Sequence, residues 1–158
     1  MQKIIYFMLL ILIPFNVLAD KEKLPIPRFA TIKSAEANVR KGPGVQYPTI
    51  YIYQYKWLPV EIIAEYEQWR KIKDVKGDEG WIHSSILSGK RSVIINSKDE
   101  QFLYKSNNLR AKMIAKLMPN LVCSLNKCIK SWCKIKCENN VGWVSRSAIW
   151  GVHENEFQ

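Results

Sequence analysis

Histidine and acidic residues are scarce in this 158-residue chain. It has two histidines, His83 and His153, and 14 Asp and Glu against 24 Lys and Arg. The sequence offers no pair of carboxylates at the spacing of glycoside hydrolases, no Gly-rich phosphate loop and no metal-binding motif. We therefore expect a protein that is not an enzyme and that requires neither a metal nor a cofactor.

Amphipathic stretches of helical length are missing after the N-terminal segment. Short apolar, β-branched runs are present instead, such as LPVEIIAEY (58–66) and WRKIKDV (69–75), and the turn KGDEG (76–80) follows the second run. Several short strands within about sixty residues are typical of a small, strongly bent sheet or a partly open barrel. The fold class predicted from these runs is all-β.

Cysteine is missing from the first half of the chain, and the four that occur lie within fifteen positions: Cys123, Cys128, Cys133 and Cys137. No Cys-x-x-Cys pair and no nearby histidine accompany them, which disfavours zinc and redox chemistry. If VCSLNKCI and WCKIKC are antiparallel neighbours, Cys128 lies opposite Cys133 and Cys123 almost opposite Cys137. This nested pairing is one of three possible connectivities, and it requires a bulge in one strand.

The formal net charge is +10, which favours anionic partners. The start, MQKIIYFMLLILIPFNVLAD, has the basic, apolar and small-residue order of a secretory signal peptide, with cleavage expected after Ala19. Its apolar part is short for a membrane span, so no transmembrane segment is expected after cleavage. Export makes nucleic acid a poor partner, predicts a periplasmic or secreted protein, and suits an even number of cysteines in disulfides.

One supersecondary pattern occurs twice, at an offset of sixty-three positions. Trp69 aligns with Trp132, and the Lys-Ile-Lys that follows each tryptophan also aligns. A repeat of this length indicates two small similar domains. The predicted organisation is a signal peptide (1–19), a first domain (28–90), a second domain (98–152) and a frayed tail (153–158).

The run ANVRKGPGVQYPTI (37–50) resembles the opening motif of bacterial SH3 (SH3b) domains. The later run WRKIKDVKGDEGWIHSSILSG and the second-unit run VGWVSRSAIWGV are similar to other strands of exported tandem SH3-like proteins, whose function is largely unassigned. The second unit lacks the Gly-Pro of the first loop. The resemblance covers about Phe29 to Val152 and implies two small SH3-like β-barrels in tandem. Because such barrels occur as cell-wall targeting modules, it also implies recognition of peptidoglycan or its stem peptides.

In the first unit Tyr51, Tyr53, Tyr55 and Trp57 stand at alternate positions, so that in a strand they would share one face and form a peptide groove. High β-propensity alone is the alternative explanation. Asn38, Arg40 and Tyr47 lie in or beside the first loop, where Arg40 could pair with a carboxylate or remain solvated. Trp69 could face outward or cover a barrel end. The candidate ligand-binding residues are Asn38, Arg40, Tyr47, Tyr51, Tyr53, Tyr55, Trp57 and Trp69. The expected function is binding of peptidoglycan, with docking of an envelope protein as the alternative.

Overall fold

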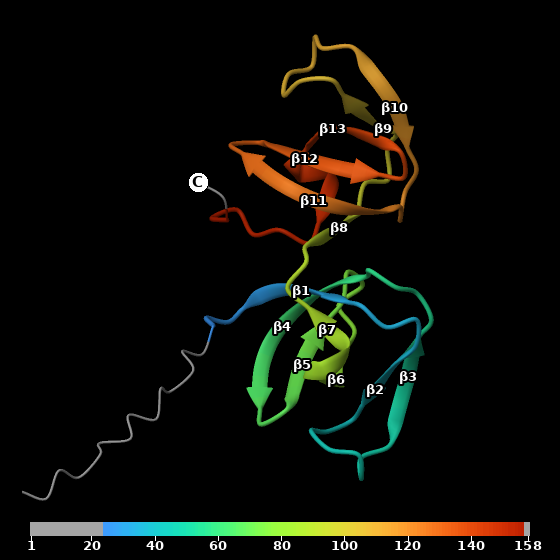
Figure 1. The fold of residues 1–158 in the computed structure, drawn as a ribbon, viewed down its shortest axis with the longest axis vertical. Helices are drawn as coiled ribbons and strands as arrows, with labels where there is room; N and C mark the ends of the chain where they lie inside the picture. Colours follow the sequence, from blue (N-terminus) through green and yellow to red (C-terminus); the bar gives the residue numbers. More distant parts are fainter. Residues whose placement is uncertain (1–23, 157–158) are drawn as a thin grey trace, which may run out of the picture.

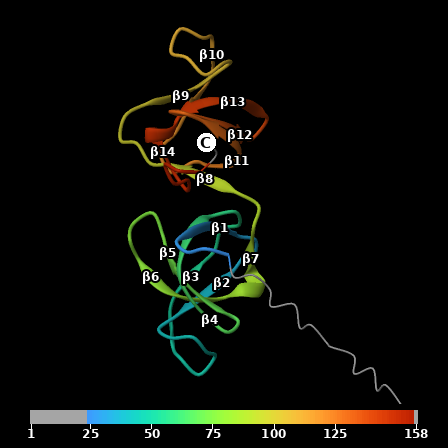
Figure 2. The same cartoon turned by 90° about the vertical axis from the view of Figure 1, so that its left-hand side faces the viewer.

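The structure is a computed structural model that describes residues 24–156, so the predicted signal peptide lies outside the described residues. Residues 24–156 form two antiparallel sheets of seven strands each, which follow one another along the chain and confirm the all-β prediction. Each sheet is strongly bent, and the two units are stacked along the long axis of the molecule (Figures 1 and 2). No helix within the described residues is long and apolar enough to cross a membrane.

The first unit contains seven strands in the spatial order β3-β2-β6-β5-β4-β1-β7, so β3 lies at one edge of the sheet. A short 3-10 helix, η1 (Ser84–Ile86), leads from β6 into β7. The strands are β1 (Arg28–Ile32), β2 (Ala37–Arg40), β3 (Thr49–Tyr53), β4 (Pro59–Tyr66), β5 (Trp69–Lys73), β6 (Glu79–His83) and β7 (Leu87–Ser88).

The second unit has the equivalent order, β10-β9-β13-β12-β11-β8-β14, so the internal repeat of the sequence is a repeat of topology. Its 3-10 helix, η2 (Arg146–Ala148), again precedes the last strand. The strands are β8 (Ser92–Ile95), β9 (Gln101–Tyr104), β10 (Met113–Leu117), β11 (Val122–Ile129), β12 (Trp132–Cys137), β13 (Asn140–Ser145) and β14 (Ile149–Trp150).

Each unit has its own apolar core, built from alternate residues of its strands. In the first unit Val60, Ile72 and Ile82 are fully buried, and in the second unit Ile135 and Val144 are. Because side chains alternate between the faces of a strand, burial of Ile72 in β5 and Ile135 in β12 turns the lysines on either side of each isoleucine outward. Two separate cores agree with the sixty-three-residue repeat.

The second core also contains two disulfides, Cys123–Cys137 and Cys128–Cys133, which is the nested pairing that the sequence favoured. Cys128 and Cys133 are direct cross-strand partners in the ladder of β11 and β12. The ladder changes register between Leu125 and Lys127, which is the bulge that this pairing requires. Covalent links therefore hold the hairpin of the second unit at both ends.

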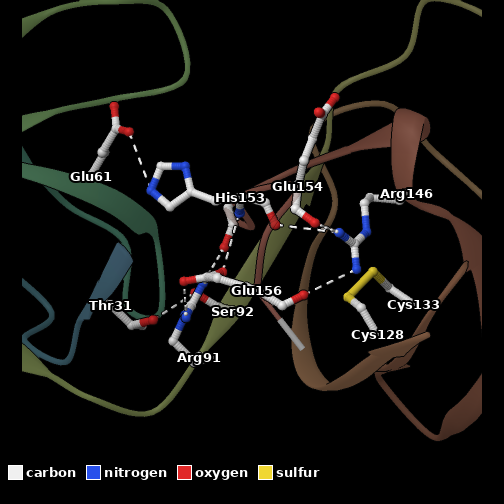
Figure 3. Close-up of polar contacts among 11 residues, drawn as sticks. Thr31, Glu61, Arg91, Ser92, Cys128, Cys133, Arg146, His153, Glu154 and Glu156 are labelled. Atoms are coloured by element: carbon white, nitrogen blue, oxygen red, sulfur yellow. Dashed lines mark hydrogen bonds and ion pairs between the residues drawn. A yellow bond between two sulfur atoms is a disulfide. The ribbon is translucent and has the colours of Figure 1, made fainter. Parts of the chain in front are cut away.

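The two units meet at a polar and aromatic junction, and Figure 3 shows its polar contacts. The hydroxyls of Thr31 and Ser92, one from each unit, are hydrogen-bonded at 2.8 Å and are buried. Phe29 of β1 contacts Trp150 edge-to-face, with ring centroids 4.9 Å apart. The same ring lies 4.5 Å from that of His153, whose Nε2 is 3.5 Å from a carboxylate oxygen of Glu61.

The C-terminal segment completes this junction, so the prediction that residues 153–158 form a frayed tail is wrong as far as Glu156. Both carboxylate oxygens of Glu156 accept hydrogen bonds from the Arg91 guanidinium, at 2.9 and 2.8 Å (Figure 3). The Arg146 guanidinium donates to the backbone carbonyls of His153, Glu154 and Glu156. Charge-assisted hydrogen bonds of this kind are the strong ones, and here they fix the segment against the second unit, while His153 contacts Phe29 and Glu61 of the first unit.

Candidate functional site

A cleft of about 740 Å³ lies between the two units. This volume lies in the range of small-molecule and peptide sites. The turn between β3 and β4 and the turn between β5 and β6 form its first-unit wall, and the start of β11 with part of β8 forms the other. Its lining residues are Ile52, Tyr53, Gln54, Tyr55, Lys56, Leu58, Pro59, Asp74, Val75, Lys76, Ile94, Asn120, Leu121 and Val122.

Asp74 organises the polar side of the cleft. One of its carboxylate oxygens accepts hydrogen bonds from the backbone N–H groups of Lys76 at 2.9 Å and Asp78 at 3.0 Å, which shapes the turn after β5. The other oxygen accepts a hydrogen bond from the Tyr53 hydroxyl at 3.0 Å. One carboxylate therefore fixes both the turn and an aromatic wall of the site.

Tyr53 is held as a neutral phenol. Burial raises its pKa above the usual range, and the adjacent Tyr51 and the Asp74 carboxylate raise it further. Its ring packs edge-to-face against that of Tyr51, with centroids 5.3 Å apart. The tyrosine thus remains a hydrogen-bond donor to Asp74 throughout the physiological pH range.

The charges at the mouth of the cleft are mixed. Lys56 and Lys76 are exposed and line the cleft together with the half-buried Asp74. Apolar side chains such as Leu58 and Leu121 provide the remaining walls. An apolar cleft with an anionic and two cationic groups is suited to a ligand that carries both amino and carboxylate groups.

The internal repeat explains why the carboxylate that lines the cleft comes from the first unit. Asp74 occupies the position that Cys137 occupies in the second unit, sixty-three residues later. There the side chain is in a disulfide with Cys123 and is buried. The same strand end therefore carries a buried disulfide in one unit and a cleft-lining carboxylate in the other.

The expectation that Tyr51, Tyr53, Tyr55 and Trp57 share one strand face is wrong, because β3 ends at Tyr53. Tyr51 and Tyr53 do lie on the same face and pack together, but Tyr55 and Trp57 belong to the turn that follows. Tyr53 and Tyr55 line the cleft, whereas Trp57 lines a separate hollow. The backbone at Trp57 is left-handed, which breaks the alternation of side chains between the two faces. The alternation of aromatic residues along the sequence does not reveal this.

Asn38, Arg40 and Tyr47 are placed away from the cleft. The Arg40 guanidinium donates to the backbone carbonyls of Val45 and Tyr47, at 3.2 and 2.8 Å, and so closes the loop after β2. Tyr47 packs over Gly42, where an added Cβ would lie 2.5 Å from the tyrosine ring. The loop motif is therefore built from internal contacts, and a role of these residues in binding stays a prediction.

Trp69 lies on the outer face of β5, while Ile72 of the same strand is fully buried. Its ring contacts that of His83 edge-to-face, with centroids 5.3 Å apart. In the second unit Ser145 occupies the position of His83, and Trp132 instead contacts Tyr104 of β9 edge-to-face, with centroids 5.6 Å apart. Both tryptophans are half-buried under a neighbouring ring, outside the lining of the cleft.

The sequence interpretation missed several residues of the site, namely Asp74, Lys76 and the second-unit turn at Asn120–Val122. The turn sequence DVKGD (74–78) carried one usable signal, since Asp at its first position favours an Asx turn. The cleft residues of the second unit reach the site only because of how the two units pack against each other. No local pattern in the sequence predicts such packing. No group of three or more His, Cys, Asp or Glu side chains in residues 24–156 is arranged to hold a metal ion.

The profile of the bacterial SH3 domain family matches the chain twice, at residues 33–89 and 97–151. These two matches cover both units, and the chain therefore belongs to the bacterial SH3 domain family. The family resemblance that the sequence suggested is confirmed.

Among solved structures the chain is similar to NlpC2 and NlpC1 from Trichomonas vaginalis, with sequence identities of 11% and 10% and a TM-score of 0.37 for each. The match covers 82% and 80% of this chain and 50% and 46% of those chains, so this chain spans about half the length of the solved proteins. No curated protein matches the chain.

Proposed function

We propose that this protein is a non-catalytic binding module that recognises the stem peptides of cell-wall peptidoglycan in the cleft between its two SH3 units. The observation that carries the proposal is the cleft of about 740 Å³, which combines apolar walls with Tyr53, Asp74 and two lysines. Each unit supplies part of the wall, so a ligand would contact both domains at once.

Stem peptides match this chemistry. They are short chains of mainly small residues that carry free amino and carboxylate groups. The carboxylates would lie near the ammonium groups of Lys56 and Lys76, an amino group would lie near Asp74, and small side chains would pack against Leu58 and Leu121. The net charge of +10 adds a general attraction to anionic envelope polymers.

An extracytoplasmic location suits this function. Two disulfides fasten the second unit, and disulfides persist in oxidising compartments. Together with the N-terminal sequence, they support a periplasmic or secreted protein whose partners lie in the envelope and exclude nucleic acid from the expected partners.

The test is retention of residues 20–158 on purified peptidoglycan at low and moderate salt, with Tyr55→Ala as the test variant. Tyr55 is 73% exposed, so its removal leaves the fold intact while it removes an aromatic wall of the cleft. We expect binding about tenfold weaker, a loss of ~1.4 kcal/mol.

The matched control is Tyr66→Ala, because Tyr66 is also an exposed tyrosine but lies at the far end of β4, outside the cleft lining. This control should bind as the wild type does. Equal retention of the three proteins, or retention that salt abolishes equally in all of them, would leave only non-specific attraction and would refute the proposal.

A specific observation favours docking of an envelope protein as the second candidate. Strand β3 is an edge of the first sheet, and Ile50 and Ile52 on it are exposed at 48% and 45%. By strand pairing, Lys116 of β10 occupies the position that Ile52 has in β3, and charged residues at sheet edges discourage strand addition. An extended segment of a partner could therefore pair with β3. Capture of the same envelope protein by wild type but not by Ile50→Lys would support this candidate.

A further inference from the structure

Trp57 has a backbone conformation that its side chain does not favour. Its φ is 69°, in the left-handed region, which Gly, Asn and Asp adopt far more readily than bulky residues. The equivalent position of the second unit is Asn120, with φ 64°. The two residues also make equivalent hydrogen bonds, from Trp57 N–H to Ile32 O at 2.7 Å and from Asn120 N–H to Ile95 O at 2.9 Å. The turn therefore needs a left-handed residue, but it does not need a tryptophan.

Packing in the core does not account for the tryptophan. Its side chain is 46% exposed. The partly buried residues that pack against the first core are Tyr53, Leu58, Ile86 and Leu87, and Trp57 is outside this set. A residue that is unfavourable for the backbone and half exposed to water is a candidate for a binding role, because strained conformations concentrate at functional sites.

The indole lines a second hollow of about 210 Å³, which we call the junction hollow and which is bounded by Thr31, Trp57, Lys90, Arg91, Ser92 and Ser124. Its walls come from both units and are hydroxyl-rich and cationic. Thr31 and Ser92 are hydrogen-bonded to each other, and Arg91 is bound to Glu156. The exposed groups beside the indole are therefore the Lys90 ammonium and the Ser124 hydroxyl.

An aromatic plate with a hydroxyl and an ammonium group beside it is suited to one class of ligand, a pyranose ring. Such a ring has an apolar C–H face that packs on an indole, and a rim of hydroxyl or acetamido groups that accepts and donates hydrogen bonds. The hollow has room for about one ring. A single aromatic platform of this size does not suit an extended peptide.

The junction hollow lies next to the cleft, which indicates that a sugar in the hollow and a peptide in the cleft could belong to the same molecule. Lys56 and Leu58 line the cleft, whereas Trp57 between them lines the hollow, so one turn separates the two sites. Peptidoglycan presents the same juxtaposition, since each stem peptide is attached to a sugar of the glycan strand. We propose that Trp57 binds a sugar ring of that strand while the cleft holds its peptide; this inference rests on the proposed function.

The test variant is Trp57→Asn, which gives the first unit the residue that the second unit uses. We expect two opposite effects: the midpoint of thermal unfolding rises or stays unchanged, because Asn suits the left-handed turn, and sugar binding weakens about tenfold. Trp57→Phe, which keeps an aromatic plate, should retain much of the binding. Glu67→Asn, at another exposed left-handed turn position that lines neither the cleft nor the junction hollow, is the control and should bind the sugar as the wild type does.

Three probes separate the two sites, each followed by NMR titration of the backbone amide signals, because no tryptophan lines the cleft and Trp57→Asn removes the Trp57 indole N–H. They are a chitotetraose, the N-acetylglucosamine–N-acetylmuramic acid disaccharide without peptide, and a stem peptide without sugar. Binding of either sugar probe that Trp57→Asn abolishes supports the inference, and preference for the disaccharide identifies the wall glycan over other polysaccharides. A sugar that binds while the peptide does not would refute the peptide cleft but not the platform. No sugar binding by the wild type, or a Trp57→Asn variant that is clearly less stable, would overturn the platform.

Discussion

Glu65 and Arg70 face each other across the β4–β5 ladder, with a carboxylate oxygen of Glu65 2.8 Å from Nε of Arg70. The positions sixty-three residues later are Cys128 and Cys133, which are paired in the same way and joined by a disulfide. Glu65 also forms an ion pair with Arg28 at the start of β1. The two units thus fasten the same cross-strand position, one with charges and the other with a covalent bond.

This equivalence predicts that a disulfide can be transferred to the first unit. In a Glu65→Cys/Arg70→Cys variant, the two thiols should oxidise to a third disulfide, because the ladder already places these residues opposite each other. Closing so short a loop stabilises the fold by about 2 kcal/mol, offset by less than about 1 kcal/mol for the lost ion pair. Urea unfolding of the oxidised variant beside a Glu65→Ser/Arg70→Ser variant, both without reductant so that the native disulfides stay intact, measures the gain. Peptide mapping that finds free thiols at 65 and 70 after oxidative refolding would contradict the equivalence.

The internal repeat and the spacing of the cysteines were sufficient to predict the two units and the bulge in the second one. The offset of sixty-three residues predicted the two units, and the strand parity of Cys123 and Cys128 predicted a bulge. The bulge lies between Leu125 and Lys127, and the first unit has the same register change between Ile62 and Ala64. Both features depend on contacts between neighbouring strands, which alternation and spacing report directly.

What the sequence could not predict depends on contacts between the units. The cleft needs Leu121 and Val122 beside the turn of the first unit, and no periodicity reports such an approach. The packing of the C-terminal segment was missed for the same reason, since a short polar run such as HENE has the composition of a frayed end. Its order comes from the guanidinium groups of Arg91 and Arg146.

The C-terminal segment should hold the two units in one orientation. A chain that ends at Val152 lacks the His153 contact with Phe29 and the Glu156 ion pair with Arg91. We expect its two barrels to reorient separately, which ¹⁵N relaxation would detect as shorter rotational correlation times than those of the full chain. The control is Glu154→Ala, because Arg146 uses only the backbone carbonyl of Glu154. Unchanged correlation times in the truncated chain would show that the remaining contacts between the units suffice.

The Glu156 ion pair should make the junction sensitive to acid. Partial burial acts to raise the pKa of Glu156, but the hydrogen bond and charge of Arg91 outweigh it and lower this pKa from its usual value of 4.5. A carboxyl group whose pKa is lower in the folded state contributes stability above its unfolded pKa, and this contribution is lost as the pH falls through the folded pKa. Wild type should therefore be more stable than Glu156→Gln at pH 7, and the difference should shrink as the pH falls below 4.5 and disappear once the pH is below the folded pKa. Thermal unfolding at a series of pH values measures it; a difference that is constant with pH would argue against the ion pair.

Tyr53 should produce the opposite dependence in alkali. Its pKa in the folded state is raised by burial above the usual 10.0, whereas the unfolded chain has the usual value. The contribution of Tyr53 to stability is therefore complete below about pH 10 and is lost progressively as the pH rises above that value, because only the unfolded chain gains from ionisation. The stability of Tyr53→Phe should fall less steeply over this range. While both proteins stay folded, their phenolate absorbance should be the same, since Tyr53 remains protonated against Asp74. An excess of one phenolate in the folded wild type would show that the tyrosine titrates freely and that its bond to Asp74 does not hold the wall of the cleft.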